Sequence, residues 1–162
     1  MAGAILNLDL RGLQTFDQAV TRIEQLLRYP EPLLTDIGEA LLLSVDERFE
    51  RREDPDGMPW EPVSDKYAGR KSAGKATKRS GAVTDPGNIL ELTRDLRRLT
   101  RYQVDGETLL IGSDRVYAAT HQFGDPKRGI PARPVYGLSD DDREEIGQLV
   151  IEHLDDAVRN FP

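Results

Sequence analysis

The sequence has no cysteine in its 162 residues. This absence excludes thiolate zinc sites, iron–sulfur clusters, disulfide scaffolds and a cysteine nucleophile. Histidine is almost as scarce, with only His121 and His153, and this leaves few groups for proton transfer near neutral pH. Aromatic residues make up 6% of the chain, and Trp60 is its single tryptophan. The chain is therefore poor in the side chains that catalytic and metal centres commonly use.

Long apolar runs are also missing. The first apolar run, near the N-terminus, is broken by Asn7 and Asp9 and has no basic flank, which argues against a secretory signal. No run approaches the roughly 20 apolar residues that a membrane-spanning helix needs. We therefore expect a soluble protein with no membrane contact. The length favours a single domain over residues 1–162, large enough to bury a core without disulfides or metals.

Charge is distributed unevenly along the chain. The net charge is −7, yet the stretch from Ser64 to Gly81 holds six basic residues against Asp65 alone, so it carries +5 and the remainder −12. This asymmetry predicts a flexible basic loop, within residues 64–88, on an acidic body. Three interpretations of this loop are open. It is solvated and makes no contact, it contacts nucleic acid, or it contacts an acidic protein surface such as that of a neighbouring copy. The candidate contact residues are Lys66, Arg70, Lys71, Lys75, Lys78 and Arg79.

Apolar residues spaced three and four apart predict two helices in the first third of the chain. The first is expected to begin at a capping box formed by Thr15 and Gln18. It should end near Tyr29, because the residue before Pro30 is disfavoured in a helix. The second, about 32–53, carries an apolar stripe on one side and acidic residues on the other, so we expect it to be amphipathic.

A third long helix is predicted at the C-terminal end, over residues 139–160. Ser139 and Asp142 form a capping pattern at its start, where acidic residues also suit the helix dipole. A short helix is expected over residues 116–123, ended by Gly124 in a left-handed conformation.

The remaining segments predict a small, mostly antiparallel sheet. Alternating residues on both sides of Asp105-Gly106 favour a hairpin with a type I′ turn, whose central residues both need positive φ. Pro131 and Pro134 stiffen an extended segment and remove amide donors, which suits only the edge of a sheet. The fold class is therefore α+β, with long helices packed on the sheet. Its expected strands are residues 4–10, 101–105, 107–112 and a segment near 132–137.

No pattern in the sequence indicates a catalytic, cofactor or metal site. His121 has no recognisable nucleophile or paired carboxylate nearby, so a structural hydrogen-bonding role is favoured over a small hydrolase. His153 is expected to be a partly buried structural residue. Asp54-Pro55-Asp56-Gly57 resembles the start of a calcium loop but lacks the later ligands, so a turn is favoured. Phosphate-binding motifs are absent.

Two residues are expected to anchor loops. Trp60 follows the turn and should pack against the core with its indole N–H paired. Arg133 lies in the stiff extended segment, where its planar fork suits a carboxylate, either within the fold or on a neighbouring copy. The alternative is an ordinary surface arginine.

Several blocks of sequence together resemble the virion morphogenesis or tail completion family of tailed bacteriophages, which includes proteins of Mu-like phages. The blocks cover roughly residues 35 to 157 and occur in the family's order and spacing. They are Phe49, Asp54-Pro55-Asp56-Gly57-x-Pro59-Trp60, Ile89-Leu90-x-Leu-Thr93-x-x-Leu96, Ile111-Gly112-Ser113, Tyr117-Ala118-x-x-His121-Gln122-Phe123-Gly124 and Ile130-Pro131-Ala132-Arg133-Pro134.

The resemblance implies a structural virion protein with no enzymatic activity and no cofactor. Such a protein is assembled in the host bacterial cytoplasm and acts at the junction of tail and head. Its expected partners are further copies of itself in a ring, with a hexamer favoured, tail-tube and neck or connector proteins, and packaged DNA in the lumen. Its motif and structural residues would be Asp54, Pro55, Asp56, Gly57, Trp60, Gly112, Tyr117, His121, Phe123, Gly124, Arg133 and Pro134.

Two hypotheses follow from these patterns. In the structural one, the basic loop contacts the acidic helix of the next copy, about 139–156, or lines the channel through which DNA passes. The alternative is a nucleic-acid-binding module that uses the basic residues between 66 and 79. The sequence pI of 4.9 and the scarcity of aromatic residues around the lysines count against the alternative.

Overall fold

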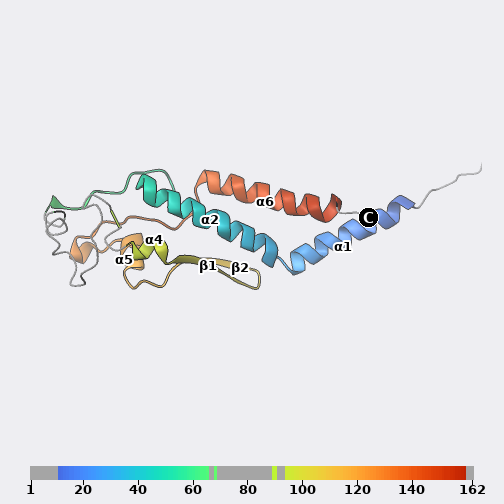
Figure 1. Ribbon diagram of the computed structural model, residues 1–162, viewed down its shortest axis with the longest axis horizontal. Helices are drawn as coiled ribbons and strands as arrows, with labels where there is room; N and C mark the ends of the chain where they lie inside the picture. Colours follow the sequence, from blue (N-terminus) through green and yellow to red (C-terminus); the bar gives the residue numbers. More distant parts are fainter. Residues whose placement is uncertain (1–10, 66–67, 69–88, 91–93, 160–162) are drawn as a thin grey trace, which may run out of the picture.

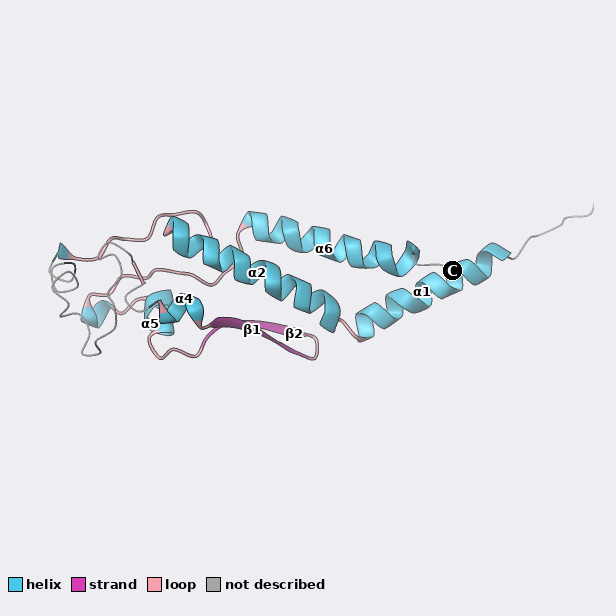
Figure 2. Ribbon diagram, viewed as in Figure 1, coloured by secondary structure: helices cyan, strands magenta, loops and turns pink. Residues whose placement is uncertain are grey.

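The structure is a computed structural model that describes residues 11–65, 68, 89–90 and 94–159. The predicted strand at 4–10 and all six candidate residues of the basic loop lie outside these ranges. The fold class is α+β, as predicted (Figures 1 and 2). Its elements are α1 (Arg11–Arg28), α2 (Glu31–Arg51), α4 (Asp95–Arg98), β1 (Thr100–Asp105), β2 (Thr108–Ser113), α5 (Ala118–Phe123), the 3-10 turn η1 (Pro126–Arg128) and α6 (Asp140–Arg159).

Helix α2 is the central element of an elongated molecule. Helix α6 runs back along one side of it, and the β1–β2 hairpin lies on the other side (Figure 1). Helix α1 contacts the far end of α6 and extends beyond it, away from the body. At the opposite end, α4 and α5 lie near the last turns of α2, and Leu96 and Ala118 pack in one cluster with Val45 and Phe49 (Figure 1). None of the described helices is both long and apolar enough to cross a membrane.

The predicted stripe of α2 forms one side of the core. Ile37, Leu41, Val45 and Phe49 are buried along it, at the spacing that places residues on one helix face. The helix ends at Arg51, and its C-cap residue Arg52 adopts a left-handed conformation (φ 59°, ψ 43°) and donates its N–H to the Arg48 carbonyl. The main hydrophobic cluster continues from this end through Trp60, Ile89, Leu96, Ala118 and Val135.

The predicted hairpin is confirmed, but its turn is of a different type. The register pairs Thr100 with Ser113 at the open end and Asp105 with Thr108 at the turn. The two central residues are therefore Gly106 and Glu107, and only Gly106 has positive φ (60°). That is the signature of type II′ and not of the expected type I′ turn.

Helix α1 begins earlier than predicted. Thr15 lies inside the helix, four residues after Arg11, so the expected capping box at Thr15 and Gln18 is wrong. The physical reason is that Leu13 continues the helical spacing of Phe16 and Val20, so the amphipathic pattern starts before the presumed cap. The end at Arg28, before Pro30, agrees with the prediction.

The expected edge strand near 132–137 is also wrong. Among the described residues the sheet has two strands, β1 and β2, and the segment after Ile130 forms no ladder. The segment is irregular, and within it Arg133 and Val135 are buried, with Val135 only 1% exposed. The two prolines lack the N–H groups that a ladder needs, as anticipated. The carbonyl groups of residues 134–137 accept hydrogen bonds from side chains instead.

Candidate assembly site: a segment clamped by side chains

Residues 133–137, here called the clamped segment, pass through the end of the molecule where most of the motif blocks meet. Each of its last four carbonyl groups, from Pro134 to Gly137, accepts a hydrogen bond from a side chain. Buried main-chain groups need partners, and a segment without a ladder must find them elsewhere. The side chains that supply them are Trp60, Arg48 and Gln122.

Gln122, at the end of α5, substitutes for a neighbouring strand. Its Oε1 accepts hydrogen bonds from the N–H groups of Val135 (2.9 Å) and Tyr136 (3.0 Å), while its Nε2 donates to the Tyr136 carbonyl (2.7 Å). One carboxamide thus satisfies three main-chain groups, because it has both acceptor and donor atoms. Gln122 belongs to a motif block, yet nothing in the sequence singled it out from its neighbours.

Trp60 fulfils its prediction. It is buried, packs edge-on against Phe49 with ring centroids 5.6 Å apart, and donates from Nε1 to the Pro134 carbonyl at 2.8 Å. A buried indole needs such an acceptor. The ring therefore ties the loop after α2 both to the core and to the clamped segment.

Arg133 is buried, with 5% of its surface exposed, so it is not an ordinary surface arginine. Its Nε donates to the Glu61 carbonyl (2.7 Å) and its Nη2 to the Pro62 carbonyl (3.1 Å), so in these bonds the fork meets main-chain oxygens and not the expected carboxylate. Residues 61–62 lie outside helices and strands. Their carbonyl groups therefore accept no ladder hydrogen bonds and can accept from the guanidinium. A buried guanidinium is tolerable because it is hydrogen-bonded in this way.

His121 contributes its main chain to the same arrangement. Its carbonyl accepts a hydrogen bond from the Arg133 N–H at 2.7 Å, and its ring packs edge-on to Tyr117 with centroids 6.0 Å apart. The ring atom Nδ1 is buried, and among the described residues it has no hydrogen-bond partner. Burial lowers the pKa of His121, and the positive charges of Arg133 and Arg128 lower it further. The environment thus favours the neutral ring, and the hydrogen bond to Arg133 is made by the backbone of His121.

Gly124 allows the chain to double back after α5. Its φ is 75° with ψ 174°, so the predicted positive φ is confirmed, although the residue is extended and not in the left-handed helical region. A Cβ at this position would lie 2.8 Å from the Ala132 nitrogen and 3.0 Å from the Ile130 oxygen. Only glycine combines this conformation with so close an approach of the main chain.

The block Asp54-Pro55-Asp56-Gly57 forms the favoured turn. One oxygen of Asp54 accepts hydrogen bonds from the N–H groups of Asp56 and Met58, both at 2.9 Å, and Gly57 has a φ of 76°. Pro55 packs so close to Gly137 that a Cβ there would lie 2.8 Å from it. The Asp54 carboxylate therefore orders the turn, and the turn lies against the clamped segment.

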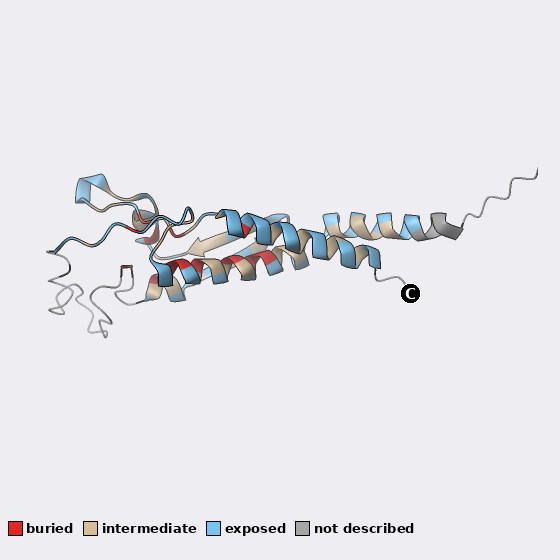
Figure 3. Cartoon of the chain, turned by 90° about the horizontal axis from the view of Figure 1, so that it is seen from above, coloured by how far each residue is buried: buried red, intermediate tan, exposed pale blue. Residues whose placement is uncertain are grey.

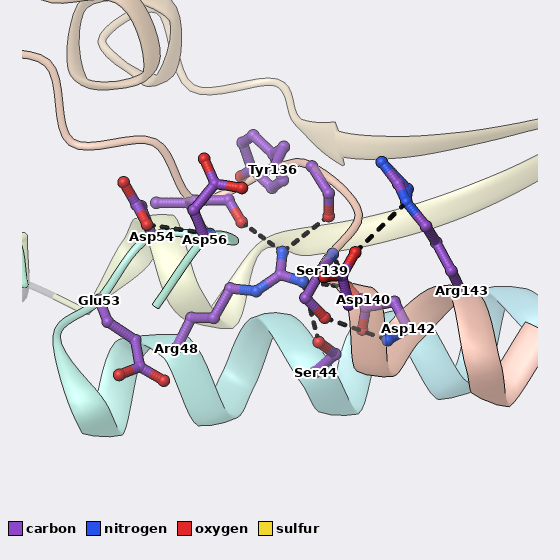
Figure 4. Close-up of polar contacts among 12 residues, drawn as sticks. Ser44, Arg48, Glu53, Asp54, Asp56, Tyr136, Ser139, Asp140, Asp142 and Arg143 are labelled. Atoms are coloured by element: carbon purple, nitrogen blue, oxygen red, sulfur yellow. Dashed lines mark hydrogen bonds and ion pairs between the residues drawn. The ribbon is translucent and has the colours of Figure 1, made fainter. Parts of the chain in front are cut away.

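A buried ion pair between α2 and the start of α6 was not anticipated from the sequence. Arg48 donates to the carbonyls of Val135 (2.9 Å) and Gly137 (2.8 Å), to the Ser44 hydroxyl (3.1 Å) and to Asp142. The two charged side chains are 5% and 3% exposed. Figure 4 shows the guanidinium reaching from α2 to the first turn of α6. The pair thus joins both helices to the clamped segment.

Asp142 also confirms the predicted cap of α6. Its carboxylate accepts from the Ser139 N–H (2.7 Å), and the Ser139 hydroxyl accepts from the Asp142 N–H (3.0 Å), which is a reciprocal capping box. Burial acts to raise the pKa of Asp142, but hydrogen bonds from Ser44 and Ser139 and the charge of Arg48 outweigh it and hold the pKa below its ordinary value. Arg48 itself could have been suspected, because it occupies the apolar face of α2, three residues after Val45.

Other motif residues lie outside this arrangement. Gly112 is in β2, where a Cβ would meet no atom within 4 Å. Phe123 is 79% exposed, close in sequence to the fully exposed Val116. A hollow of about 490 Å³ opens between α2, the 53–57 turn and the start of α6, with Glu47, Glu53, Asp56, Asp140, Asp141 and Glu145 among its lining residues. Within the described ranges, no three His, Cys, Asp or Glu side chains are placed to hold a metal ion.

Comparison with known proteins decides the family. The model of the phage virion morphogenesis family matches residues 12–155. The chain belongs to the phage virion morphogenesis family. This confirms the resemblance drawn from the motif blocks, and the match extends it to α1. The geometry agrees with the family's structural role in phage assembly, since the motif residues of the clamped segment hold a chain in place.

Two curated relatives are similar over much of their length. "Putative capsid assembly protein G" of Escherichia phage Mu is 35% identical over 162 residues, which cover 95% of this chain and 90% of the phage Mu protein. "Uncharacterized protein MJ0331" of Methanocaldococcus jannaschii is 28% identical over 106 residues, covering 65% of this chain and 75% of that protein. No solved structure gives a significant match.

Proposed function

We propose that this chain is a structural assembly protein of a tailed bacteriophage that completes the tail or joins it to the head at the neck. In this role it forms a closed ring of identical copies, with a hexamer favoured, and it carries out no enzymatic reaction. Its partners are tail-tube and neck or connector proteins, and DNA passes through the lumen. The family membership and the relative named as a phage Mu capsid assembly protein support the proposal.

The observation that carries the proposal is how the motif residues use their polar groups. The hydrogen bonds described above from Trp60, Gln122 and Arg133 go to main-chain atoms, and Arg48 and Asp142 form an ion pair in a buried position. Groups engaged in this way are not available to attack or protonate a substrate. Such residues instead fix the shape of one end of the molecule, and a subunit that must fit several neighbours needs a fixed shape.

A gene deletion in the phage that encodes the chain tests this role. Electron microscopy of the lysate should show heads and tails that fail to join, and supplying the chain from a plasmid should restore complete particles that contain it. Complete, infectious particles without the chain would contradict the proposal. The alternative as a nucleic-acid-binding module rests on residues outside the described ranges, and submicromolar binding of duplex DNA by the isolated chain in a gel shift would favour it.

The ring itself calls for a separate measurement. Particle-bound or purified assemblies should have a mass near a small multiple of 18.2 kDa, measured by light scattering of the chain alone and mixed with tail-tube protein. An open filament or a lone subunit in the particle would contradict the closed ring while leaving an assembly role in place.

A further inference from the structure

Helix α1 carries an apolar face that the described part of the chain leaves exposed. Phe16, Val20 and Leu27, here called the α1 face, are 67%, 46% and 68% exposed. The half-buried residues Ala19, Ile23 and Leu26 lie elsewhere around the same helix. In two perpendicular views the first half of α1 extends past the end of α6 (Figures 1 and 3). Contact with α6 therefore covers only part of the apolar surface of α1.

This exposure is unfavourable for a helix of this kind. In proteins most of the stability of a helix comes from tertiary packing of its amphipathic face. Helix α1 has 18 residues, and none of those from Phe16 to Arg28 is buried. None of the described residues buries the α1 face, so an additional surface that covers it would stabilise the helix.

Helix α6 offers a second apolar patch. Ile151 and Val158, here called the α6 face, are 55% and 42% exposed and stand seven residues apart, on one side of the helix. Leu154 lies between them and is half-buried. The α1 face and the α6 face are thus two different patches of helical spacing on the same chain.

The two helices also carry opposite net charge. Helix α1 has three arginines against Asp17 and Glu24, a net +1, whereas α6 has eight carboxylates against two arginines, a net −6. A difference in the sign of net charge between two elements influences which of them approach each other. Two α6 helices would repel each other, whereas an α1 helix and an α6 helix attract.

We propose that the α1 face of one copy packs on the α6 face of a second copy of this chain. The two patches differ, so the contact is head-to-tail, and its repetition closes a ring or continues as a filament. The inference deepens the proposed function and rests on it for the ring. It names α1 as the arm that reaches the next subunit and α6 as the surface that receives it.

The absence of cysteine makes the contact directly testable by disulfide cross-linking of the full-length chain. Val20→Cys and Ile151→Cys variants are purified separately, mixed at equal concentration and oxidised. We expect a cross-linked dimer that contains one chain of each variant, in clear excess over both homodimers. Val20→Cys mixed with Leu110→Cys is the matched control, because Leu110 (56% exposed) is as exposed as Ile151 (55%) but lies on β2. It should give little cross-linked product.

A second pair of variants measures the contribution of the contact to association. Val20→Glu with Leu27→Glu should weaken self-association at least about tenfold in sedimentation experiments, since two apolar contacts are lost. Gln25→Glu, an exposed polar position of α1, should change it little. Circular dichroism of each variant shows whether helix content is retained.

Each outcome decides a different claim. An excess of the Val20→Cys homodimer would mean that α1 pairs with α1. A chain that stays monomeric and gives no cross-links at any concentration would mean that another protein covers the α1 face. Either result overturns this inference but not the assembly role, which particle morphology tests. If the charged α1 variant loses self-association yet still completes particles, the contact stands and the ring in the proposed function fails.

Discussion

The two ends of the molecule solve the same problem in opposite ways. At the end built around the clamped segment, buried main-chain groups find partners within the chain, through Gln122, Trp60 and Arg48. At the α1 end, an amphipathic helix leaves Phe16 and Leu27 mostly in water. At one end the carbonyl groups of the clamped segment are paired within the chain, and at the other we propose that a second molecule covers the α1 face.

This difference indicates how the two ends contribute to assembly. A saturated network is rigid, because breaking any one partner leaves a buried group unpaired. A helix with few buried contacts opens easily and reorders at low cost. A fixed body and a loosely held arm suit a subunit that must keep its shape while it attaches to neighbours.

The largest effect is expected from Arg48→Ala. It leaves the Asp142 carboxylate buried without its partner and removes the donor for the carbonyls of Val135 and Gly137. Breaking a buried pair from one side costs about 3–5 kcal/mol, so urea unfolding should show a large loss of stability. The control is Arg51→Ala, whose pair with Glu47 is exposed and should contribute less than about 1 kcal/mol. Equal losses in the two variants would contradict the account.

The next effect concerns the return of the chain after α5. Gly124→Ala places a Cβ 2.8 Å from the Ala132 nitrogen in a conformation that alanine rarely adopts, so we expect a loss of about 1–3 kcal/mol or more in the free energy of unfolding. Gly129→Ala is the control, because Gly129 also has positive φ (64°) but nothing lies within 4 Å of its Cβ position. Its loss should be smaller, about 1 kcal/mol. A harmless Gly124→Ala would mean that the doubling back is loosely packed.

A smaller effect is the pH dependence that His121 confers. The pKa of His121 is lower in the folded chain than its ordinary value of 6.5, so the unfolded chain binds the proton first. Stability is therefore unaffected well above pH 6.5, falls as the pH decreases below it, and levels off below the folded pKa. His121→Gln should flatten that part of the curve in thermal unfolding at several pH values. An unchanged slope would show that His121 is protonated as easily in the fold as outside it.

The smallest effect is expected at the α1 face. Val20→Glu alters an exposed position, so the free energy of unfolding of the body should change by less than about 0.5 kcal/mol, even though self-association is weakened. The same variant thus separates stability from assembly. A large loss of stability would show that Val20 packs within its own chain, which would remove the contrast between the two ends.

Local patterns were enough to predict most of the elements. The stripe of α2, the hairpin around Gly106 and the Ser139–Asp142 capping box all depend on residues a few positions apart, and each is present. The hairpin turn and the start of α1 were misjudged by small shifts, since capping and turn signals compete with the apolar spacing around them.

The clamped segment could be predicted only in part. The prolines at 131 and 134 indicate an extended chain that cannot join a central strand, but they do not say which groups pair with it. Its partners are distant: Arg48 meets Asp142 across 94 residues and Trp60 meets Pro134 across 74. Trp60 was foreseen because any buried indole needs an acceptor. A carboxylate was expected for Arg133 because its planar fork suits one. The hydrogen bonds described above go to main-chain carbonyls instead, because the tertiary fold decides which acceptors lie within reach.

Native-state hydrogen exchange of the monomer and of the assembled form tests the central claim most directly, because it reports the two ends in one experiment. We predict that the amides of Val135 and Tyr136 exchange only through global unfolding in both forms, whereas the amides of α1 exchange rapidly in the monomer and become protected on assembly. Equal protection of α1 in both forms, or early exchange of Val135 and Tyr136, would contradict the account.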